Sequence, residues 1–247
     1  MKEREYKIID LNKSKFPDLR DLNDSGVIAF GGDLSVMRLL EAYKKGIFPW
    51  YDSSSPILWH SPLERCIFNI NAFIPSHSLK QKIKKHTFTF TFDQYFKRTM
   101  QCCALIIREK EVPGTWILNE TVEAYTELYN QGYAHSLEVW NNENIVGGLF
   151  GVSIGKAFFG ESMFHILTDA SKAALFFLFD FLKHNDFHFV DAQMPTDHLY
   201  SLGASLISRN EYLDKLENAI KYDTLRGNWN EYIGRNGYAS EFYGRSH

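Results

Sequence analysis

The chain has 247 residues, which allows one large domain, or two of unequal size, with a proper hydrophobic core. Hydrophobic residues make up 45% and charged residues 23%, so disorder, collagen and coiled coil are excluded for the chain as a whole. With 27 basic and 30 acidic side chains the formal net charge is -3, so a nucleic-acid partner would require a local basic patch. The aromatic fraction of 15% exceeds what a core needs, so some rings could line an apolar pocket or stack on bases.

The cysteines and the apolar segments indicate the compartment. Three cysteines occur, two of them adjacent, and this pattern is typical of a protein in a reducing environment. Neither a CxxC pair nor an HExxH helix is present, so we expect no metal site. The N-terminus is too charged for a signal peptide, and the most apolar window, residues 173–182, is too short to span a bilayer. We therefore expect a cytoplasmic protein without membrane contact.

The first part of the chain, residues 1–63, is rich in turn signals and contains one clear helix signal. A capping residue, Asp33 or Ser35, precedes apolar residues at helical spacing, and Gly46 ends the run. A change of texture follows, which we interpret as a domain boundary. We therefore expect a small N-terminal domain over residues 1–63 and a larger domain over residues 64–247.

The second part alternates between helical and strand patterns. Helices are predicted over residues 76–85, from residue 94, over 119–131 and over 170–183, and strands over 87–92, 135–140, 145–154, 156–164 and 187–194. Short turns join the strands between residues 135 and 164, which predicts an antiparallel meander. A mixed sheet with one long helix packed on it indicates an α+β fold.

Several short strings are too particular to be generic core. They are Gly31-Gly-Asp-Leu34, Gly46-Ile-Phe-Pro-Trp50, Trp59-His-Ser-Pro62, Gly114-Thr-Trp-Ile117, His135-Ser-Leu-Glu-Val-Trp140, Gly147-Gly-Leu-Phe-Gly151, Phe158-Phe-Gly-Glu-Ser-Met-Phe164, Ala170-Ser-Lys172 and Asp191-Ala-Gln-Met-Pro-Thr-Asp-His198. In this order and spacing they closely resemble the bacterial leucyl/phenylalanyl-tRNA–protein transferase family. The resemblance covers residues 17 to 213, with His60 standing where the family usually has a second Trp and Leu149 where a Met is common. Residues 214–247 match no motif.

The resemblance implies a fold and a reaction. The larger domain would have the acetyltransferase-like (GNAT) fold. The protein would transfer Leu or Phe, and Met less well, from aminoacyl-tRNA to the N-terminal α-amine of proteins that begin with Arg or Lys. Such products enter the N-end rule pathway of protein degradation. No metal or nucleotide cofactor is implied, and we expect a monomer whose partners are aminoacyl-tRNA and the acceptor proteins.

Asp191 and Gln193 are the first catalytic candidates. They lie two apart on a predicted strand, so alternation places both side chains on one face. A satisfied polar pair at a strand end is the structural alternative. The resemblance assigns the pair to catalysis, with Asp191 orienting Gln193 near the attacking amine. Because an amide has no useful basicity, we expect Gln193 to position the amine or the tetrahedral intermediate, while the ribose hydroxyl could carry the proton. We expect alanine substitution of either residue to leave the fold intact.

Glu161 is the third catalytic candidate and lies within a very aromatic strand, where an unpaired carboxylate would be costly. It could be a buried carboxylate bound to the backbone or to an Arg. The functional interpretation, which we favour, is contact with the cationic acceptor or with the amino or ribose groups of the donor. Gly160 before it allows a bulge or a close approach.

The resemblance also implies an apolar pocket for the transferred side chain, lined by Phe158, Met163, Leu149 and Leu175. Strict alternation would place Phe158 and Met163 on opposite faces of the predicted strand. A shared pocket therefore requires a bulge at Gly160.

Two further groups are candidates for binding tRNA. Trp50, Trp116, Tyr43 and Tyr125 could be core aromatics, but the two Trp residues have loop-like contexts suited to stacking on an unpaired 3′ adenine. The densest basic run of the chain consists of Lys80, Lys82, Lys84 and Lys85. Such runs are usually solvated helix faces, yet the family's basic cluster falls at the same place, so we expect phosphate contacts.

Two other functions remain open at this stage. An acyl-CoA-dependent N-acetyltransferase would share the fold but needs a pyrophosphate cradle of the type Gln/Arg-x-x-Gly-x-Gly/Ala between a strand and a helix. No such string occurs, and Ala170-Ser-Lys172 opens the corresponding long helix instead. A noncatalytic module that binds tRNA or peptide N-termini is the second alternative, although the three catalytic candidates are all present.

Overall fold

The computed structural model describes residues 8–20, 22, 26–71, 73–105 and 115–233. The end of the expected larger domain, residues 234–247, and Gly114 of the motif around Trp116 lie outside the described residues. Among the described helices, none combines the length and the hydropathy that a bilayer crossing requires.

The first part of the chain forms a small sheet and one helix. The strands are β1 (Ile9–Asp10), β2 (Val27–Phe30), β3 (Phe48–Pro49) and β4 (Leu58–His60), in the order β1-β2-β4-β3. Helix α1 (Val36–Lys44) begins after Ser35, whose side chain accepts a hydrogen bond from the backbone N–H of Arg38. Of the two capping residues that the sequence offered, Ser35 is therefore the N-cap.

The rest of the chain builds a seven-stranded sheet in the order β11-β5-β10-β9-β8-β7-β6. Its strands are β5 (Glu64–Asn69), β6 (Thr89–Phe92), β7 (Ala134–Asn141), β8 (Asn144–Ile154), β9 (Ala157–His165), β10 (Phe189–Gln193) and β11 (Ser205–Ser208). Strands β7, β8 and β9 form the predicted antiparallel meander. In this sheet β9 and β10 pair in parallel and the other neighbours pair antiparallel, so the fold is the predicted mixed α+β type.

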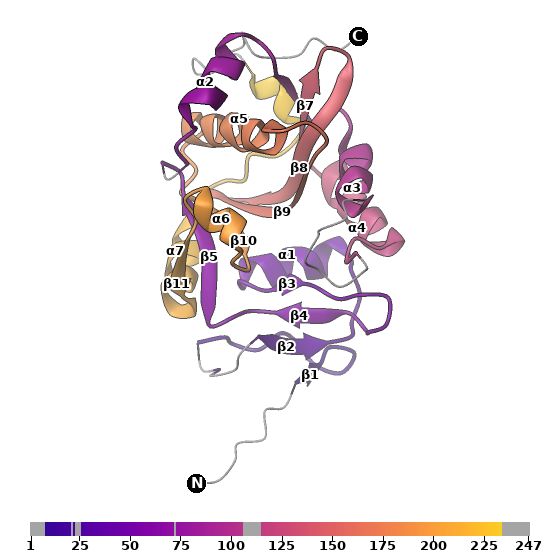
Figure 1. The fold of residues 1–247 in the computed structure, drawn as a ribbon. Helices are drawn as coiled ribbons and strands as arrows, with labels where there is room; N and C mark the ends of the chain where they lie inside the picture. Colours follow the sequence, from indigo (N-terminus) through magenta and orange to yellow (C-terminus); the bar gives the residue numbers. More distant parts are fainter. Residues whose placement is uncertain (1–7, 21, 23–25, 72, 106–114, 234–247) are drawn as a thin grey trace.

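Helices cover both faces of the large sheet (Figure 1). They are α2 (His77–Lys84), α3 (Phe96–Leu105), α4 (Asn119–Asn130), α5 (Ala170–His184), α6 (Asp197–Ser201) and α7 (Arg209–Ala219), followed by a short 3-10 helix, η1 (Trp229–Tyr232). Helix α5 packs on one face, where its apolar side chains join a core that includes Phe158 and Leu149. Helices α3 and α4 pack on the other face, in a core that includes Phe150 and Phe159. The sequence predicted α2 to α5 at these places.

The small and large sheets share a hydrophobic core. Trp59 of β4 and Tyr43 of α1 belong to the same buried cluster as Phe159 of β9 and Tyr125 of α4. Residues up to 60 supply the small sheet and residues from 64 supply the large one. The division into domains at residue 63 stays a prediction, and the shared core means that α1 is packed directly against the larger sheet.

Residues beyond the last motif have a structural role that the sequence did not reveal. Trp229 is completely buried, and its ring stacks on His135 at 3.9 Å and on Phe181 of α5 at 4.7 Å between centroids. Its backbone N–H donates to the Asp93 carboxylate at 2.7 Å. The 3-10 helix therefore closes the core beneath α5 and connects it to the start of α3.

This packing predicts that Trp229→Ala lowers the free energy of unfolding by about 3–5 kcal/mol, because a large buried ring leaves a cavity that the sheet cannot fill. Urea denaturation followed by circular dichroism measures the change. Tyr222→Ala is the matched control, since Tyr222 is 50% exposed and should cost less than about 1 kcal/mol. Equal stability of the Trp229 variant and the wild type would contradict the assignment.

Candidate active site

A bulge in β9 creates the site. Gly160 and Ser162 pair with consecutive residues of β8, so Glu161 is an extra residue in the ladder. The bulge has the position that a shared pocket required. As a result Phe158 and Met163 both pack into the core beneath α5, whereas Glu161 points to the opposite face. A side chain would not fit at Gly151, which lies opposite the bulge, because a Cβ atom placed there would lie 2.5 Å from the Phe158 ring.

The Glu161 carboxylate is surrounded by hydrogen-bond donors from three elements. The Tyr43 hydroxyl of α1 donates to Oε1 at 2.7 Å, and the Tyr125 hydroxyl of α4 donates to Oε2 at 3.4 Å. The Gln193 side-chain amide of β10 donates to Oε1 at 3.2 Å. The two tyrosine hydroxyls are also close enough to share a hydrogen bond, in which case one of them donates to the other in place of Glu161. Burial raises the pKa of Glu161 to about 8, although the tyrosine hydrogen bonds act in the opposite direction.

Asp191 has a different environment, because it is completely buried and paired with a cation. Arg65 of β5 donates from Nε to Oδ1 at 2.8 Å and from Nη2 to Oδ2 at 2.7 Å. The Tyr212 hydroxyl of α7 donates to Oδ2 at 2.6 Å. The backbone N–H of Gln193 donates to Oδ1 at 2.9 Å. All the acceptor positions of this carboxylate are therefore used inside the protein.

The contact between Asp191 and Gln193 runs through the backbone. The ladder with β5 shifts between these two residues, and Gln193 has a positive φ of 55°. This conformation sends the Gln193 amide to Glu161 while Asp191 holds the Gln193 main chain. The structure argues against the expectation that alanine at Asp191 leaves the fold intact, because the change would leave the Arg65 guanidinium buried without its counter-ion.

Arg65 and Tyr212 are the members of the site that sequence reasoning missed. Besides Asp191, Arg65 binds the Gly46 carbonyl at 3.2 Å, and its guanidinium lies over the rings of Phe48 at 4.6 Å and Tyr212 at 4.5 Å. A charged residue inside an apolar strand, as in Arg65-Cys-Ile-Phe68, is a signal for a buried partner. Nothing in the sequence pattern distinguished Tyr212.

The predicted pocket residues lie together. Phe158, Leu149 and Leu175 are buried in the core beneath α5, and Met163 is partly buried against the same core. Met163 belongs to the strand that carries Glu161, on the opposite face. The structure therefore brings these four side chains into one apolar cluster next to the bulge, and their role as a pocket stays a prediction.

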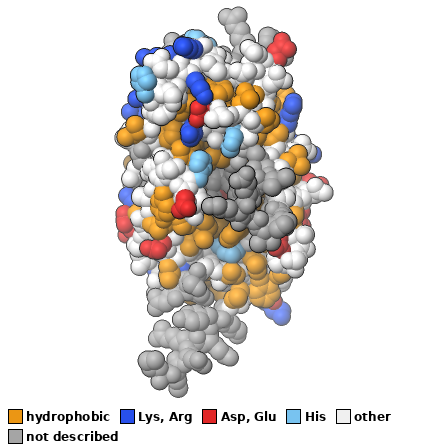
Figure 2. Space-filling view, viewed as in Figure 1, with side chains coloured by type: hydrophobic (Ala, Val, Ile, Leu, Met, Phe, Trp, Pro, Cys, Tyr) orange, Lys and Arg blue, Asp and Glu red, His pale blue; other side chains and the backbone are white. Residues whose placement is uncertain are grey.

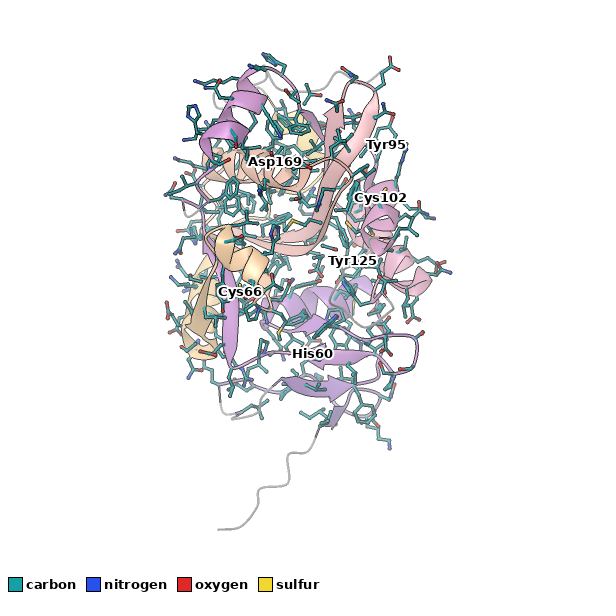
Figure 3. The ribbon with its side chains drawn as sticks, in the orientation of Figure 1. His60, Cys66, Tyr95, Cys102, Tyr125 and Asp169 are labelled. Carbon is teal, nitrogen blue, oxygen red and sulfur yellow. The ribbon has the colours of Figure 1, made fainter. Side chains whose placement is uncertain are left out.

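The four aromatic candidates separate into two pairs. Tyr43 and Tyr125 (Tyr125 is labelled in Figure 3) are completely buried, and their hydroxyls contact Glu161. Their burial does not favour base stacking, and their contact with the tRNA 3′ end stays a prediction. Trp50 is 47% exposed and tilted against His60, with centroids 5.6 Å apart. Trp116 is partly buried, with its ring edge against Tyr125.

The basic run lies on α2 as predicted, with Leu79 and Ile83 buried against the core. The exposed lysines are Lys80, Lys84 and Lys85. Lys82 forms an ion pair at 2.7 Å with Asp169, which precedes α5. Figure 2 shows Lys and Arg side chains gathered in the upper half of the molecule, the half in which Figure 1 places α2. This surface is basic although the whole chain is acidic.

Comparison with known proteins decides the family. The family model for leucyl/phenylalanyl-tRNA protein transferase matches residues 67–217, and the model for its N-terminal domain matches residues 32–63. A leucyl/phenylalanyl-tRNA–protein transferase of Maridesulfovibrio salexigens is 50% identical over 215 residues, which cover 87% of this chain and 89% of the relative. The chain belongs to the leucyl/phenylalanyl-tRNA–protein transferase family.

Other members of the family support the same assignment. The transferase of Lawsonia intracellularis is 49% identical over 87% of this chain and 94% of its own length. That of Legionella pneumophila strain Corby is 48% identical over 87% of this chain and 95% of its own length.

A solved structure, a functionally unknown conserved protein from Staphylococcus epidermidis, aligns with a TM-score of 0.39 and 10% identity, covering 74% of this chain and 68% of that chain.

The described residues of this transferase family member contain no group of three or more His, Cys, Asp or Glu side chains placed to hold a metal ion. The site is instead built from Glu161, Gln193 and the buried Arg65–Asp191 pair. These groups can orient an amine, bind a cation and exchange a proton.

The buried pair predicts that Asp191→Ala lowers the free energy of unfolding by about 3–5 kcal/mol, because Arg65 is left as an unpaired buried charge. The double variant Arg65→Met/Asp191→Leu removes both charges and should be more stable than Asp191→Ala alone. Urea denaturation of both variants and the wild type gives the comparison. If Asp191→Ala unfolded with the stability of the wild type, the pair would not be structural.

Proposed function

We propose that this protein transfers Leu or Phe, and Met less well, from aminoacyl-tRNA to the N-terminal α-amine of proteins that begin with Arg or Lys. The observation that carries the proposal is its 50% identity, over 87% of the chain, with a protein named leucyl/phenylalanyl-tRNA–protein transferase. A cytoplasmic monomer that marks proteins for the N-end rule pathway, without a metal or nucleotide cofactor, completes the proposal.

The acceptor amine is placed at Glu161 and Gln193. A carboxylate that faces the site favours a cationic partner, and the Gln193 amide lies 3.2 Å from it. Gln193 orients the amine and the tetrahedral intermediate by hydrogen bonding. Asp191 acts as a positioning residue, since it holds the Gln193 backbone and does not face the substrate.

The donor is placed on the other side of the bulge and on the exposed rings. The transferred side chain occupies the apolar cluster of Phe158, Met163, Leu149 and Leu175, where the flexible Met suits both Leu and Phe. The exposed ring of Trp50 stacks on the terminal adenine of the tRNA, and Trp116 contacts the same end of the tRNA. The lysines of α2 contact the tRNA phosphates.

The larger unit is proposed to be an acetyltransferase-like (GNAT) domain. The parallel pair β9–β10, connected through α5, supports this assignment. The region where an acyl-CoA pyrophosphate would bind, the start of α5, is occupied by Asp169, whose pKa is lowered by its hydrogen bond with Lys82. Lys82 and Lys172 both pair with this carboxylate. The start of α5 lacks the Gly-rich string of a pyrophosphate cradle, which favours aminoacyl-tRNA over acyl-CoA as the donor.

The function is tested by incubating the protein with Phe-tRNA and a peptide that begins with Arg, and measuring the Phe-Arg product by mass spectrometry. The same peptide with an acetylated N-terminus is the control, and acetyl-CoA replaces Phe-tRNA in a parallel reaction. In this assay Gln193→Ala should lower turnover by roughly 10²–10³, the usual cost of one positioned polar group in a transition state. Gln131→Ala, on the surface after α4, should retain wild-type turnover. Transfer of acetyl groups but not of Phe would overturn the proposal.

The α2 lysines predict a specific salt dependence. Lys80→Glu/Lys84→Glu should raise the KM for Phe-tRNA and flatten its log–log salt slope by about 1.5, since each phosphate contact contributes about 0.7–0.9. Transfer from a minimal phenylalanyl-adenosine donor, which lacks these phosphates, should be almost unchanged. Lys13→Glu/Lys221→Glu carries the same charge change elsewhere on the surface and should leave the slope intact. Equal loss with both donors would show that the α2 lysines are structural.

A further inference from the structure

Aminoacyl transfer to an α-amine requires that the protonated amine lose a proton. An N-terminal α-ammonium has a pKa of about 7.7–8.0, so at neutral pH most of the acceptor is protonated and cannot attack an ester. The Gln193 amide has no basicity that could remove this proton. The site therefore needs another acceptor, and the candidates are its two carboxylates.

Asp191 cannot serve as this acceptor. Its two oxygens receive four hydrogen bonds, from Nε and Nη2 of Arg65, the Tyr212 hydroxyl and the Gln193 backbone. The side chain has no exposed surface, so an incoming amine cannot approach it. Protonating Asp191 would also leave the Arg65 guanidinium without a counter-charge in the core.

Glu161 meets the geometric requirements. It is the extra residue of the β9 bulge and is partly exposed, unlike Asp191. Its Oε2 atom receives one long hydrogen bond, from Tyr125 at 3.4 Å, so it retains acceptor capacity. Its Oε1 atom contacts the Gln193 amide, which places the carboxylate next to the group that orients the amine. We propose that Glu161 is the catalytic base that takes the proton from the acceptor's α-ammonium, an inference that rests on the proposed function.

The electrostatics of the site match this role. The phenols of Tyr43 and Tyr125 donate to Glu161, the Asp191 charge raises its pKa, and the Arg65 charge lowers it. Burial is the largest effect, and the pKa of Glu161 is raised to about 8. A base whose pKa lies near that of the acid it deprotonates exchanges the proton at little free-energy cost. An ordinary exposed Glu, with a pKa of about 4.3, would be a much poorer base.

The step balances with groups that the reaction supplies. One N–H bond of the α-ammonium breaks and the proton moves to a Glu161 oxygen. The nitrogen lone pair then attacks the ester carbonyl carbon, and the C–N bond forms. When the tetrahedral intermediate collapses, the bond from the carbonyl carbon to the ribose oxygen breaks, and that oxygen receives a second proton from the nitrogen. Glu161 returns its proton to solvent, which leaves a new peptide bond and a deacylated tRNA.

The pH dependence of turnover tests the inference. Single-turnover rates are measured at saturating Arg-peptide from about pH 6.5 to 8.5, with the wild type and Glu161→Gln. In the wild-type complex the bound ammonium favours the ionised form of Glu161, so the rate should vary little above about pH 7. In the Glu161→Gln variant only the fraction of acceptor whose α-amine is already neutral can react. Its rate should be about tenfold lower at pH 7 and rise about fivefold between pH 7 and pH 8, following the neutral fraction of the amine.

Two further variants make the result specific. Burial also raises the pKa of Glu138, to about 7, and Glu138→Gln should keep the flat wild-type profile because that carboxyl is buried away from the site among Thr91 and Ser136. Tyr43→Phe removes a hydrogen bond that lowers the pKa of Glu161. Glu161 should then be protonated up to a higher pH, so the loss of activity at low pH should begin at a higher pH than in the wild type.

The outcomes separate this inference from the proposed function. A wild-type protein that makes no Phe-Arg product at any pH would overturn the proposed function and the inference with it. If the wild type is active and the pH–rate profile of Glu161→Gln runs parallel to the wild-type profile, the inference alone is overturned. Loss of a residue that only binds the acceptor lowers the rate by the same factor at every pH. A steeper profile for Glu161→Gln supports the base.

Discussion

The ion pair between Arg65 and Asp191 connects β5, β10, α7 and the turn after α1. Arg65 lies on β5 and Asp191 on β10, and the same guanidinium holds the Gly46 carbonyl at the end of α1. Tyr212 adds α7 to the group through its hydroxyl. Removing two charges from water is costly, and here the cost is offset by a bidentate pair and by further hydrogen bonds to each partner. The pair therefore fixes the β10 end, and with it the backbone of Gln193.

Two irregularities at the β9–β10 pair turn this frame into a site. The strands pair in parallel up to Asp191, after which β9 bulges at Glu161 and β10 ends at Gln193 with a positive φ. Regular strands would have kept these side chains apart, whereas the two deviations bring them within 3.2 Å. The site then holds two carboxylates in different electrostatic environments. Asp191 is neutralised by a permanent counter-ion, and Glu161 is surrounded by neutral donors that leave its protonation free to change.

The sequence by itself determined the local structure and the family. Helical spacing predicted α1, after Asp33 or Ser35 as a cap, and α2, and alternation with short turns predicted the β7–β9 meander. These signals depend on residues close in the chain, so no tertiary information was needed. Gly160 within an aromatic strand even indicated the bulge. The ordered motifs, from Gly46-Ile-Phe-Pro-Trp50 to the segment that starts at Asp191, were sufficient for the family because their order and spacing are specific.

The tertiary structure alone decided which side chains serve the site and which serve the fold. Arg65 and Asp191 are 126 residues apart, and Tyr43 and Glu161 are 118 apart, so no local pattern reports either contact. The sequence did not show that Asp191 and Tyr43 are completely buried. Trp229, beyond the last motif, proved to be core. Burial depends on what the rest of the chain places around a residue, and a strand or helix pattern specifies only which face points inward.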